Sequence, residues 1–270
     1  MLPTQNVTEY VLARIEDATQ KIVKALNITG PFNIQFIAKD SDVMVIECNL
    51  RAPRSFPFIS KTMGVDFIEA ATKLMVDKSV EDMPLPTIGT RNRPSNYVGV
   101  KAPMFSFTRL GGADPILGVE MASTGEVACF GSDVHEAFLK AMISTNFRIP
   151  KKRIALTIQS DLLEEVVHHV WDLHKMGYEL LATQETYPFL QAKGIPATFV
   201  HYADSDKLPN IRSMISNEDI DLVVNLPSLS SSGGTEAKNN YVTRRTAVDF
   251  GIPLVTNPQI FQMLGTHSLT

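Results

Sequence analysis

The feature that most constrains this fold is a regular alternation of short apolar segments and helical segments that begins at residue 154. Segments such as Ile154–Ile158 and Asp221–Asn225 are apolar along most of their length, as strands buried on both faces are. Apolar strands that alternate with helices are typical of a parallel sheet covered on both sides, so we predict an α/β domain. Its expected strands are 154–158, 178–182, 197–200, 221–225 and 253–256, and its expected helices are 162–176, 186–192, 209–216 and 240–250.

A different pattern precedes the segment Asn146–Arg153, whose proline and basic triplet mark the best domain boundary. Before it, apolar residues recur every three or four positions from Val11 to Ala25, which predicts a helix. Strands, a hairpin and further helices follow without regular alternation. We therefore predict two domains: an α+β lobe over 1–148 and the parallel-sheet domain over 149–270.

The composition excludes several classes of protein. The chain has 270 residues, 44% hydrophobic and 20% charged, which is ordinary for a globular protein. A net charge of −4 gives no support for binding nucleic acid or a membrane surface, and no apolar run approaches the roughly 20 residues of a membrane span. The first residues match neither a signal nor a transit peptide. Two cysteines, Cys48 and Cys129, are too few for a disulfide framework, which favours a reducing compartment.

Two alternating segments, 32–38 and 43–49, are separated by a short polar stretch and predict a β-hairpin. A loop at Asp40–Asp42 would pair Lys39 with Val43. Glu47 and Asn49 are two residues apart, so their side chains would lie on the same face of the hairpin, because side chains alternate along a strand.

In that register Gln35 lies opposite Glu47, and Asn33 lies opposite Asn49. One carboxylate and three amides then converge on one patch. Oxygen ligands of this kind suit Mg²⁺, which commonly bridges substrate phosphates. Spacing alone also fits the solvent face of an ordinary hairpin, and slightly favours it.

Arg51 and Arg54 follow the hairpin directly, and guanidinium groups there are able to hold a phosphate or carboxylate through two hydrogen bonds. The stretches Asn33–Phe36 and Val45–Lys61 resemble the ATP-grasp core of the large chain of carbamoyl-phosphate synthase, in its second synthetase half. The resemblance continues through Lys101–Phe107 and Asp114–Val127, and it covers essentially the whole chain.

This resemblance implies an ATP-dependent ligase that transfers a γ-phosphoryl group to carbamate. It implies that two arginines contact phosphate and that three hairpin side chains bind the Mg²⁺ or Mn²⁺ of ATP. The arginines are Arg51 and Arg54, and the metal ligands are Gln35, Glu47 and Asn49. One departure is Pro53, where the family more often has a small residue.

A larger departure from the family pattern lies ahead of the hairpin, where neither a Gly-rich phosphate loop nor the lysines that hold the nucleotide are found. We therefore expect the remainder of a synthase chain to supply the opposite wall of the ATP site. The 270-residue chain alone is expected to be catalytically inactive.

The expected strand ends of the second domain carry polar groups at Thr183–Thr186 and Asn225. Ligands of parallel sheets bind beyond the carboxyl ends of the strands, and Thr186 opens a helix, where free amides favour anions. Arg244 and Arg245 are expected near the start of a later helix, within reach of a carboxylate or phosphate. Helix caps and solvent-facing arginines explain the same pattern about equally well.

The motifs Leu181–Thr186, Asp221–Pro227 and Asn240–Asn257 are similar to the methylglyoxal-synthase-like domain that serves carbamoyl-phosphate synthases as an allosteric module. They are most similar to the ammonia-dependent branch that N-acetylglutamate activates. The effector contacts that this resemblance implies are Thr183, Thr186, Tyr202, Asn225, Ser228 and Asn240. Tyr202 stands where tryptophan is common, and Ser228 where asparagine is common.

The resemblance therefore predicts the carboxyl-terminal portion of a synthase of urea-cycle nitrogen metabolism, in the mitochondrial matrix. Its expected partners are the rest of the synthase chain and a small effector, with neither nucleic acid nor membrane. Two alternatives stay open: a free-standing, non-catalytic effector-binding module, and the cytoplasmic pyrimidine branch that UTP regulates. Methylglyoxal synthase activity is not expected, because Asn225 and its neighbours offer no catalytic aspartate.

Overall fold

The computed structural model describes residues 1–85, 96–117, 123–228 and 235–266. The chain divides into two compact units. Residues 1–101 and 128–137 form the first, and residues 102–127 and 138–270 form the second.

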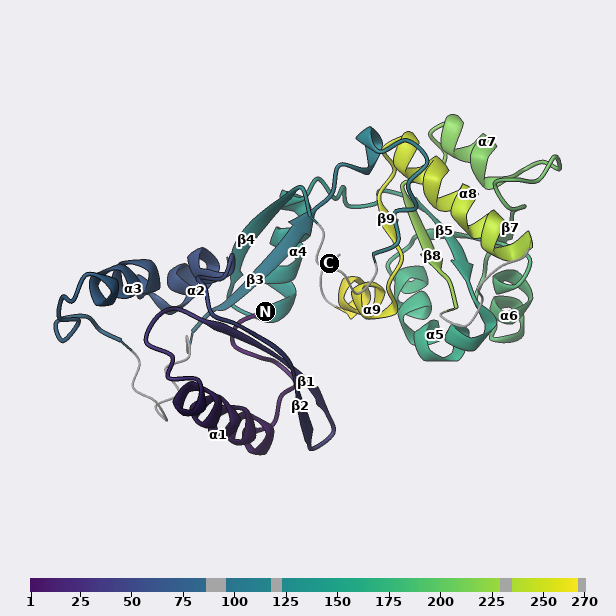
Figure 1. The fold of residues 1–270 in the computed structure, drawn as a ribbon. Helices are drawn as coiled ribbons and strands as arrows, with labels where there is room; N and C mark the ends of the chain where they lie inside the picture. The colour runs from purple at the N-terminus through teal and green to yellow at the C-terminus, as the bar shows by residue number, and fades with distance from the viewer. Residues whose placement is uncertain (86–95, 118–122, 229–234, 267–270) are drawn as a thin grey trace. The chain divides into compact units, whose positions relative to one another are not determined.

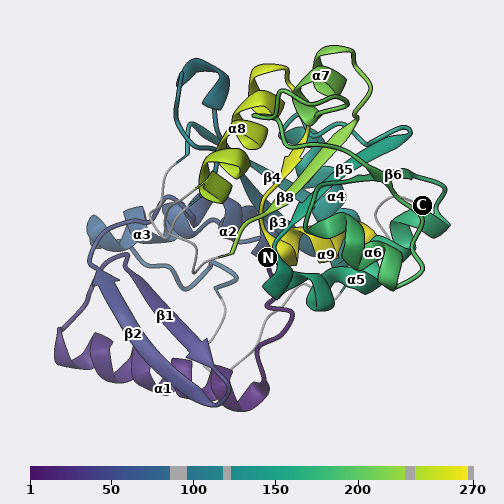
Figure 2. The same ribbon diagram turned by 90° about the vertical axis from the view of Figure 1, so that its right-hand side faces the viewer.

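The first unit begins with a helix that lies along a hairpin (Figure 2). The hydroxyl of Thr8 accepts a hydrogen bond from the backbone N–H of Val11 and caps the amino end of this helix. Asp66 caps a later helix in the same way, by accepting from the N–H groups of Ile68 and Glu69. The helices and the hairpin strands of this unit are α1 (Glu9–Ala25), β1 (Asn33–Lys39), β2 (Asp42–Asn49), α2 (Phe56–Met63) and α3 (Phe67–Met75).

A second two-stranded sheet has residues in both units. The strands are β3 (Val98–Met104) and β4 (Gly125–Gly131), and α4 (Val134–Ser144) follows β4. Gly131 is required at the end of β4, because a Cβ atom there would come within 2.4 Å of the backbone nitrogen of Ala137.

The second unit contains a five-stranded sheet in the order β7-β6-β5-β8-β9, in which every neighbouring pair is parallel. The predicted parallel sheet is therefore confirmed. A short 3-10 helix, η1 (Phe107–Arg109), precedes it. The strands are β5 (Arg153–Ile158), β6 (Glu179–Ala182), β7 (Thr198–Phe199), β8 (Leu222–Leu226) and β9 (Leu254–Val255). The helices are α5 (Ser160–Lys175), α6 (Thr186–Ala192), α7 (Ile211–Ser216), α8 (Thr235–Asp249) and α9 (Pro258–Thr266).

Helices cover both faces of this sheet (Figure 1). On one face, apolar side chains of β5, β6 and β8 pack against α7 and α8 in a buried cluster that includes Ala155, Leu181, Val223, Ile211 and Ala247. Helices α5 and α9 pack against each other on the other side. Burying this apolar surface holds the strand ends in fixed positions, which is what a binding site at the sheet edge needs.

The structure corrects the predicted hairpin loop. Lys39 pairs with Asp42 rather than with Val43, because the turn is one residue tighter, with Asp40 at a φ of 53°. A β-bulge between Gln35 and Phe36 then shifts the register by one residue. The bulge offsets the shift from the tighter turn, so the pairing beyond the bulge is the predicted one.

None of the helices in the described ranges combines the length and the apolar character needed to cross a membrane. The predicted helix at 240–250 begins earlier, at Thr235, so Arg244 and Arg245 lie in its second half rather than near its start.

Candidate functional site

The hairpin brings the predicted metal ligands to one place. Gln35 lies opposite Glu47, and Asn33 lies opposite Asn49, as the sequence predicts. The Nδ2 of Asn49 donates to the Oε1 of Glu47 at 2.8 Å. Glu47 is exposed, whereas Gln35 and Asn49 are half-buried. These three residues thus form an accessible cluster of oxygen atoms with one formal negative charge, a donor set that suits Mg²⁺ or Mn²⁺.

No three His, Cys, Asp or Glu side chains in the described ranges cluster in a way that could hold a metal ion. The metal site that the sequence predicts is the hairpin face, which carries a single carboxylate, Glu47. Arg51 and Arg54 lie between β2 and α2, and both are exposed. Their charges stand within seven residues of Glu47 along the chain, where a triphosphate held by the metal would need cations.

The second candidate site lies at the carboxyl edge of the five-stranded sheet. Thr157 of β5 pairs with Asn225 of β8, and the N–H of Thr183 donates to the carbonyl of Leu156. Side chains alternate along strands, so Thr157, Thr183 and Asn225 continue the face whose earlier positions pack against α7 and α8. Their exposed fractions are 1%, 0% and 0%. Three polar side chains thus form a buried layer above an apolar core.

Two hydroxyls of this layer are unsatisfied. The Oγ1 atoms of Thr157 and Thr183 are buried and have no hydrogen-bond partner among the residues that the structure describes. A buried polar atom without a partner typically costs about 1–3 kcal/mol, so such groups usually mark a place where water, an ion or a ligand binds.

The other predicted effector residues surround the same edge. Thr186 opens α6, and its hydroxyl accepts from the N–H of Ile158 at 2.9 Å and donates to the same residue's carbonyl at 3.1 Å. Tyr202 is buried and follows β7. Ser228 follows β8, and its hydroxyl donates to the carboxylate of Asp161 at 2.8 Å. Thr186 thus already ties α6 to β5, and Ser228 stands beside an acidic group.

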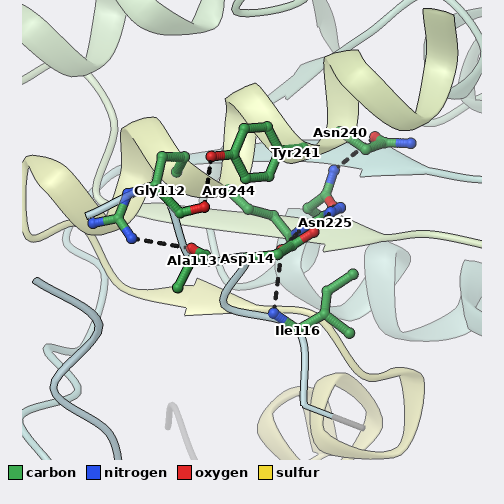
Figure 3. A network of polar contacts seen from close by, with 9 residues as sticks. Gly112, Ala113, Asp114, Ile116, Asn225, Asn240, Tyr241 and Arg244 are labelled. Carbon is green, nitrogen blue, oxygen red and sulfur yellow. Dashed lines mark hydrogen bonds and ion pairs between the residues drawn. The ribbon is translucent and has the colours of Figure 1, made fainter. Parts of the chain in front are cut away.

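Asn225 and Asn240 meet directly. The Nδ2 of Asn225 donates to the Oδ1 of Asn240 at 2.8 Å, and the Oδ1 of Asn225 accepts from Nη1 of Arg244 at 2.8 Å. Asn240 and Arg244 are 2% and 3% exposed. Asp114 completes the cluster by accepting from Nε of Arg244 at 2.8 Å and from Nη2 at 2.5 Å (Figure 3).

Arg245 has a different set of partners. It binds the carboxylate of Asp249 one turn later and donates to the backbone carbonyls of Phe107, Leu110 and Ala113, each at 3.1 Å. The hydrogen bond from Arg245 lowers the pKa of Asp249. Each arginine therefore binds a carboxylate of the chain itself rather than one of a ligand: Arg244 binds Asp114, and Arg245 binds Asp249.

Sequence reasoning missed two residues of this edge. Thr157 is the one polar residue among the five of the predicted strand Ile154–Ile158. A polar residue in an otherwise apolar buried strand could have identified it as a candidate site residue. Asp114 lies 130 residues from its partner Arg244, and no local pattern links them.

Two known families match this chain, one over the hairpin and the other over most of the parallel-sheet domain. Residues 1–83 match the family described as carbamoyl-phosphate synthase L chain, ATP binding domain. Residues 165–256 match the MGS-like domain family.

Full-length relatives match nearly the whole chain. The mitochondrial carbamoyl-phosphate synthase [ammonia] of Homo sapiens is 51% identical over 267 residues, covering 97% of this chain and 18% of the relative. The multifunctional protein pyr-3 of Neurospora crassa is 51% identical over 264 residues, covering 95% and 14%. The multifunctional protein URA2 of Saccharomyces cerevisiae is 46% identical over 272 residues, covering 98% and 12%. The chain thus spans less than a fifth of the length of these relatives.

The fold and the matches together define the class of protein: the end of an ATP-grasp ATP-binding domain followed by an MGS-like α/β domain. The chain belongs to the carbamoyl-phosphate synthase large-chain family, where it corresponds to the carboxyl-terminal portion.

Proposed function

We propose that this chain contributes metal ligands for carbamate phosphorylation and carries an allosteric site for N-acetylglutamate. In this proposal residues 1–148 complete an ATP site together with the rest of a synthase chain, and residues 149–270 form the regulatory domain. The mitochondrial matrix is the proposed location, because the similar human synthase is a mitochondrial protein.

One observation carries the effector site: the buried hydroxyls of Thr157 and Thr183 have no hydrogen-bond partner among the described residues. Thr157 pairs with Asn225 and lies next to Thr183 at the carboxyl edge of a parallel sheet. Hydroxyl and amide groups there are able to donate to a carboxylate. N-Acetylglutamate has two carboxylates and one amide, so it offers acceptors to several donors at once.

Calorimetric titration of the 270-residue chain with N-acetyl-L-glutamate tests this site. We expect saturable binding with one ligand per chain, and a weaker response to succinate, which lacks the acetamido group. If the chain takes up neither compound at millimolar concentration, the proposed effector site is wrong.

The metal proposal rests on the pairing of Gln35 with Glu47 and on the hydrogen bond between Glu47 and Asn49. Three oxygen-bearing side chains on one hairpin face fit the hard-cation preference of Mg²⁺. When bound, the metal would neutralise triphosphate charge, while Arg51 and Arg54 would bind phosphate oxygens.

Glu47→Gln in a full-length synthase that contains this region tests the hairpin. The change keeps the size of the side chain and removes its charge, so we expect carbamate phosphorylation to fall by at least about 100-fold. Glu69→Gln is the matched control, since Glu69 lies on α3 and pairs with Lys73 on the surface. Equal rates for the two variants would contradict the metal role of Glu47. The 270-residue chain alone should show no bicarbonate-dependent ATP turnover.

A second candidate function is regulation by a nucleotide such as UTP, in a cytoplasmic pyrimidine enzyme. The resemblance leaves this branch open, and the multifunctional protein pyr-3 of Neurospora crassa is as similar to the chain as the human synthase is, at 51% identity. Tighter binding of UTP than of N-acetyl-L-glutamate in the same calorimeter would favour this second function.

A further inference from the structure

A continuous chain of hydrogen bonds crosses the edge of the sheet from Asp114 to Arg244, Asn225 and Asn240 (Figure 3). Its members come from three places: the segment after η1, strand β8 and helix α8. Arg244 joins them, since one side of its guanidinium faces Asp114 and Nη1 faces Asn225.

The chemistry of Arg244 fixes the direction of this chain. A guanidinium group has only donors, so Asn225 must present its Oδ1 to Arg244. The Nδ2 of Asn225 is then the end that faces Asn240, which must accept through its own Oδ1. As a result, the Nδ2 of Asn240 is directed away from Asn225, to which its Oδ1 is bonded (Figure 3). Neither amide is able to rotate by half a turn without placing two donors against each other.

Asp114 keeps Arg244 in this role. It binds two nitrogens of the guanidinium, and the backbone N–H of Ile116 donates to one of its oxygens at 3.2 Å. The segment that carries Asp114 is fastened independently. The hydroxyl of Tyr241 donates to the carbonyl of Gly112 at 2.9 Å, and Arg245 binds three further carbonyls. With its charge balanced by Asp114, Arg244 has no need to turn toward an entering anion.

We propose that Arg244, held by Asp114, is a positioning residue that fixes both asparagine amides, so that Asn240 offers N–H donors and the effector site selects a carboxylate over an uncharged amide. This inference rests on the proposed effector site. It adds to that site a preference for a carboxylate over an amide. It assigns this preference to Arg244 and Asp114, which do not need to touch the ligand.

The test compares N-acetyl-L-glutamate with its two monoamides, N-acetyl-L-glutamine and N-acetyl-L-isoglutamine, by calorimetry on the 270-residue chain. We expect the chain to prefer the diacid over at least one monoamide by about tenfold or more. In Arg244→Gln this preference should fall at least fivefold, because glutamine is able to donate to or accept from Asn225 and no longer fixes its orientation.

Two further variants separate positioning from structure. Arg244→Lys keeps a donor-only side chain and should restore most of the preference. Lys238→Gln removes an exposed ion pair with Asp204 from the same helix without touching Asp114 or Asn225, and it should leave the preference within twofold of the unmodified chain. Equal preferences in Arg244→Gln and the unmodified chain would overturn the positioning role while leaving the effector site standing. A chain that binds none of the three compounds would overturn both.

A measurement on the unmodified chain is independent of whether Arg244→Gln folds. Titration with N-acetyl-L-glutamate should shift the side-chain NH₂ resonances of Asn240, while those of Asn225 should move little because its Nδ2 already donates to Asn240. Binding that shifts Asn225 and leaves Asn240 unchanged would contradict the proposed orientation.

Discussion

Thr157 and Thr183 lie on adjacent positions at the ends of β5 and β6, and the hydroxyls of both are buried without a hydrogen-bond partner in the described part of the chain. Burying a hydroxyl costs free energy unless another group takes up its hydrogen bond, and no described group of the chain does so for these two. Valine has nearly the same shape as threonine and lacks the hydroxyl. Thr157→Val and Thr183→Val should therefore leave the free energy of unfolding unchanged or raise it by up to about 1 kcal/mol.

The same two variants should bind N-acetyl-L-glutamate more weakly, by about one to two decades for each hydroxyl that donates to the ligand. Thermal unfolding and calorimetry on the same samples measure both effects. Thr246→Val is the matched control, because the hydroxyl of Thr246 donates to the carbonyl of Val242 within α8. Loss of stability in the Thr157 and Thr183 variants without loss of affinity would indicate that these hydroxyls are ordinary parts of the core.

Thr186 should behave differently from its neighbours. Its hydroxyl binds both the N–H and the carbonyl of Ile158, and the residue is fully buried. Thr186→Ala leaves both backbone groups without this partner and should lower the free energy of unfolding by roughly 1–3 kcal/mol, even in the absence of ligand. Thr186→Ser keeps the hydroxyl and should recover most of that loss. Denaturant unfolding of the three chains is the measurement, and equal stability of the alanine and serine variants would contradict this role.

The second domain was largely predictable because its strands and helices repeat simple patterns. Apolar strands buried on both faces and helices with one apolar stripe leave clear periodic signals, and the parallel sheet followed from them. Helices α2 and α9 were not predicted. Each contains a proline at or near its first position, where proline is compatible with a helix but interrupts the pattern in the sequence.

The hairpin shows why a register is harder to predict than a strand. Val43–Ile46 is a run of four apolar residues, so alternation does not indicate which of them face the same side. The bulge lies opposite this run, and the predicted pairings beyond it, Gln35 with Glu47 and Asn33 with Asn49, are correct. Contacts such as Asp114 with Arg244 have no counterpart in local pattern at all, since tertiary packing alone brings them together.

The last prediction concerns pH and His169 on α5. Burial lowers the pKa of His169 from its ordinary value of about 6.5, with a smaller opposing effect from Asp172 and a smaller reinforcing one from His168. Its Nδ1 is buried without a hydrogen-bond partner among the residues described, and its ring meets that of Phe261 edge to face. The folded chain therefore favours the neutral imidazole.

The sign of the pH effect follows from which state binds the proton first. Above pH 7.5 His169 is neutral in both states, so its contribution to stability is fully present. As the pH falls through about 6.5 the unfolded chain takes up a proton before the folded chain does, and the free energy of unfolding decreases until the lowered pKa is passed. His169→Gln should reduce this decrease, measured by denaturant unfolding between pH 7.5 and pH 5.5. His168→Gln is the control on the exposed side of the same helix and should leave most of the decrease in place. An identical pH dependence for the His169 variant and the unmodified chain would mean that the pKa of His169 is the same in the folded and the unfolded chain.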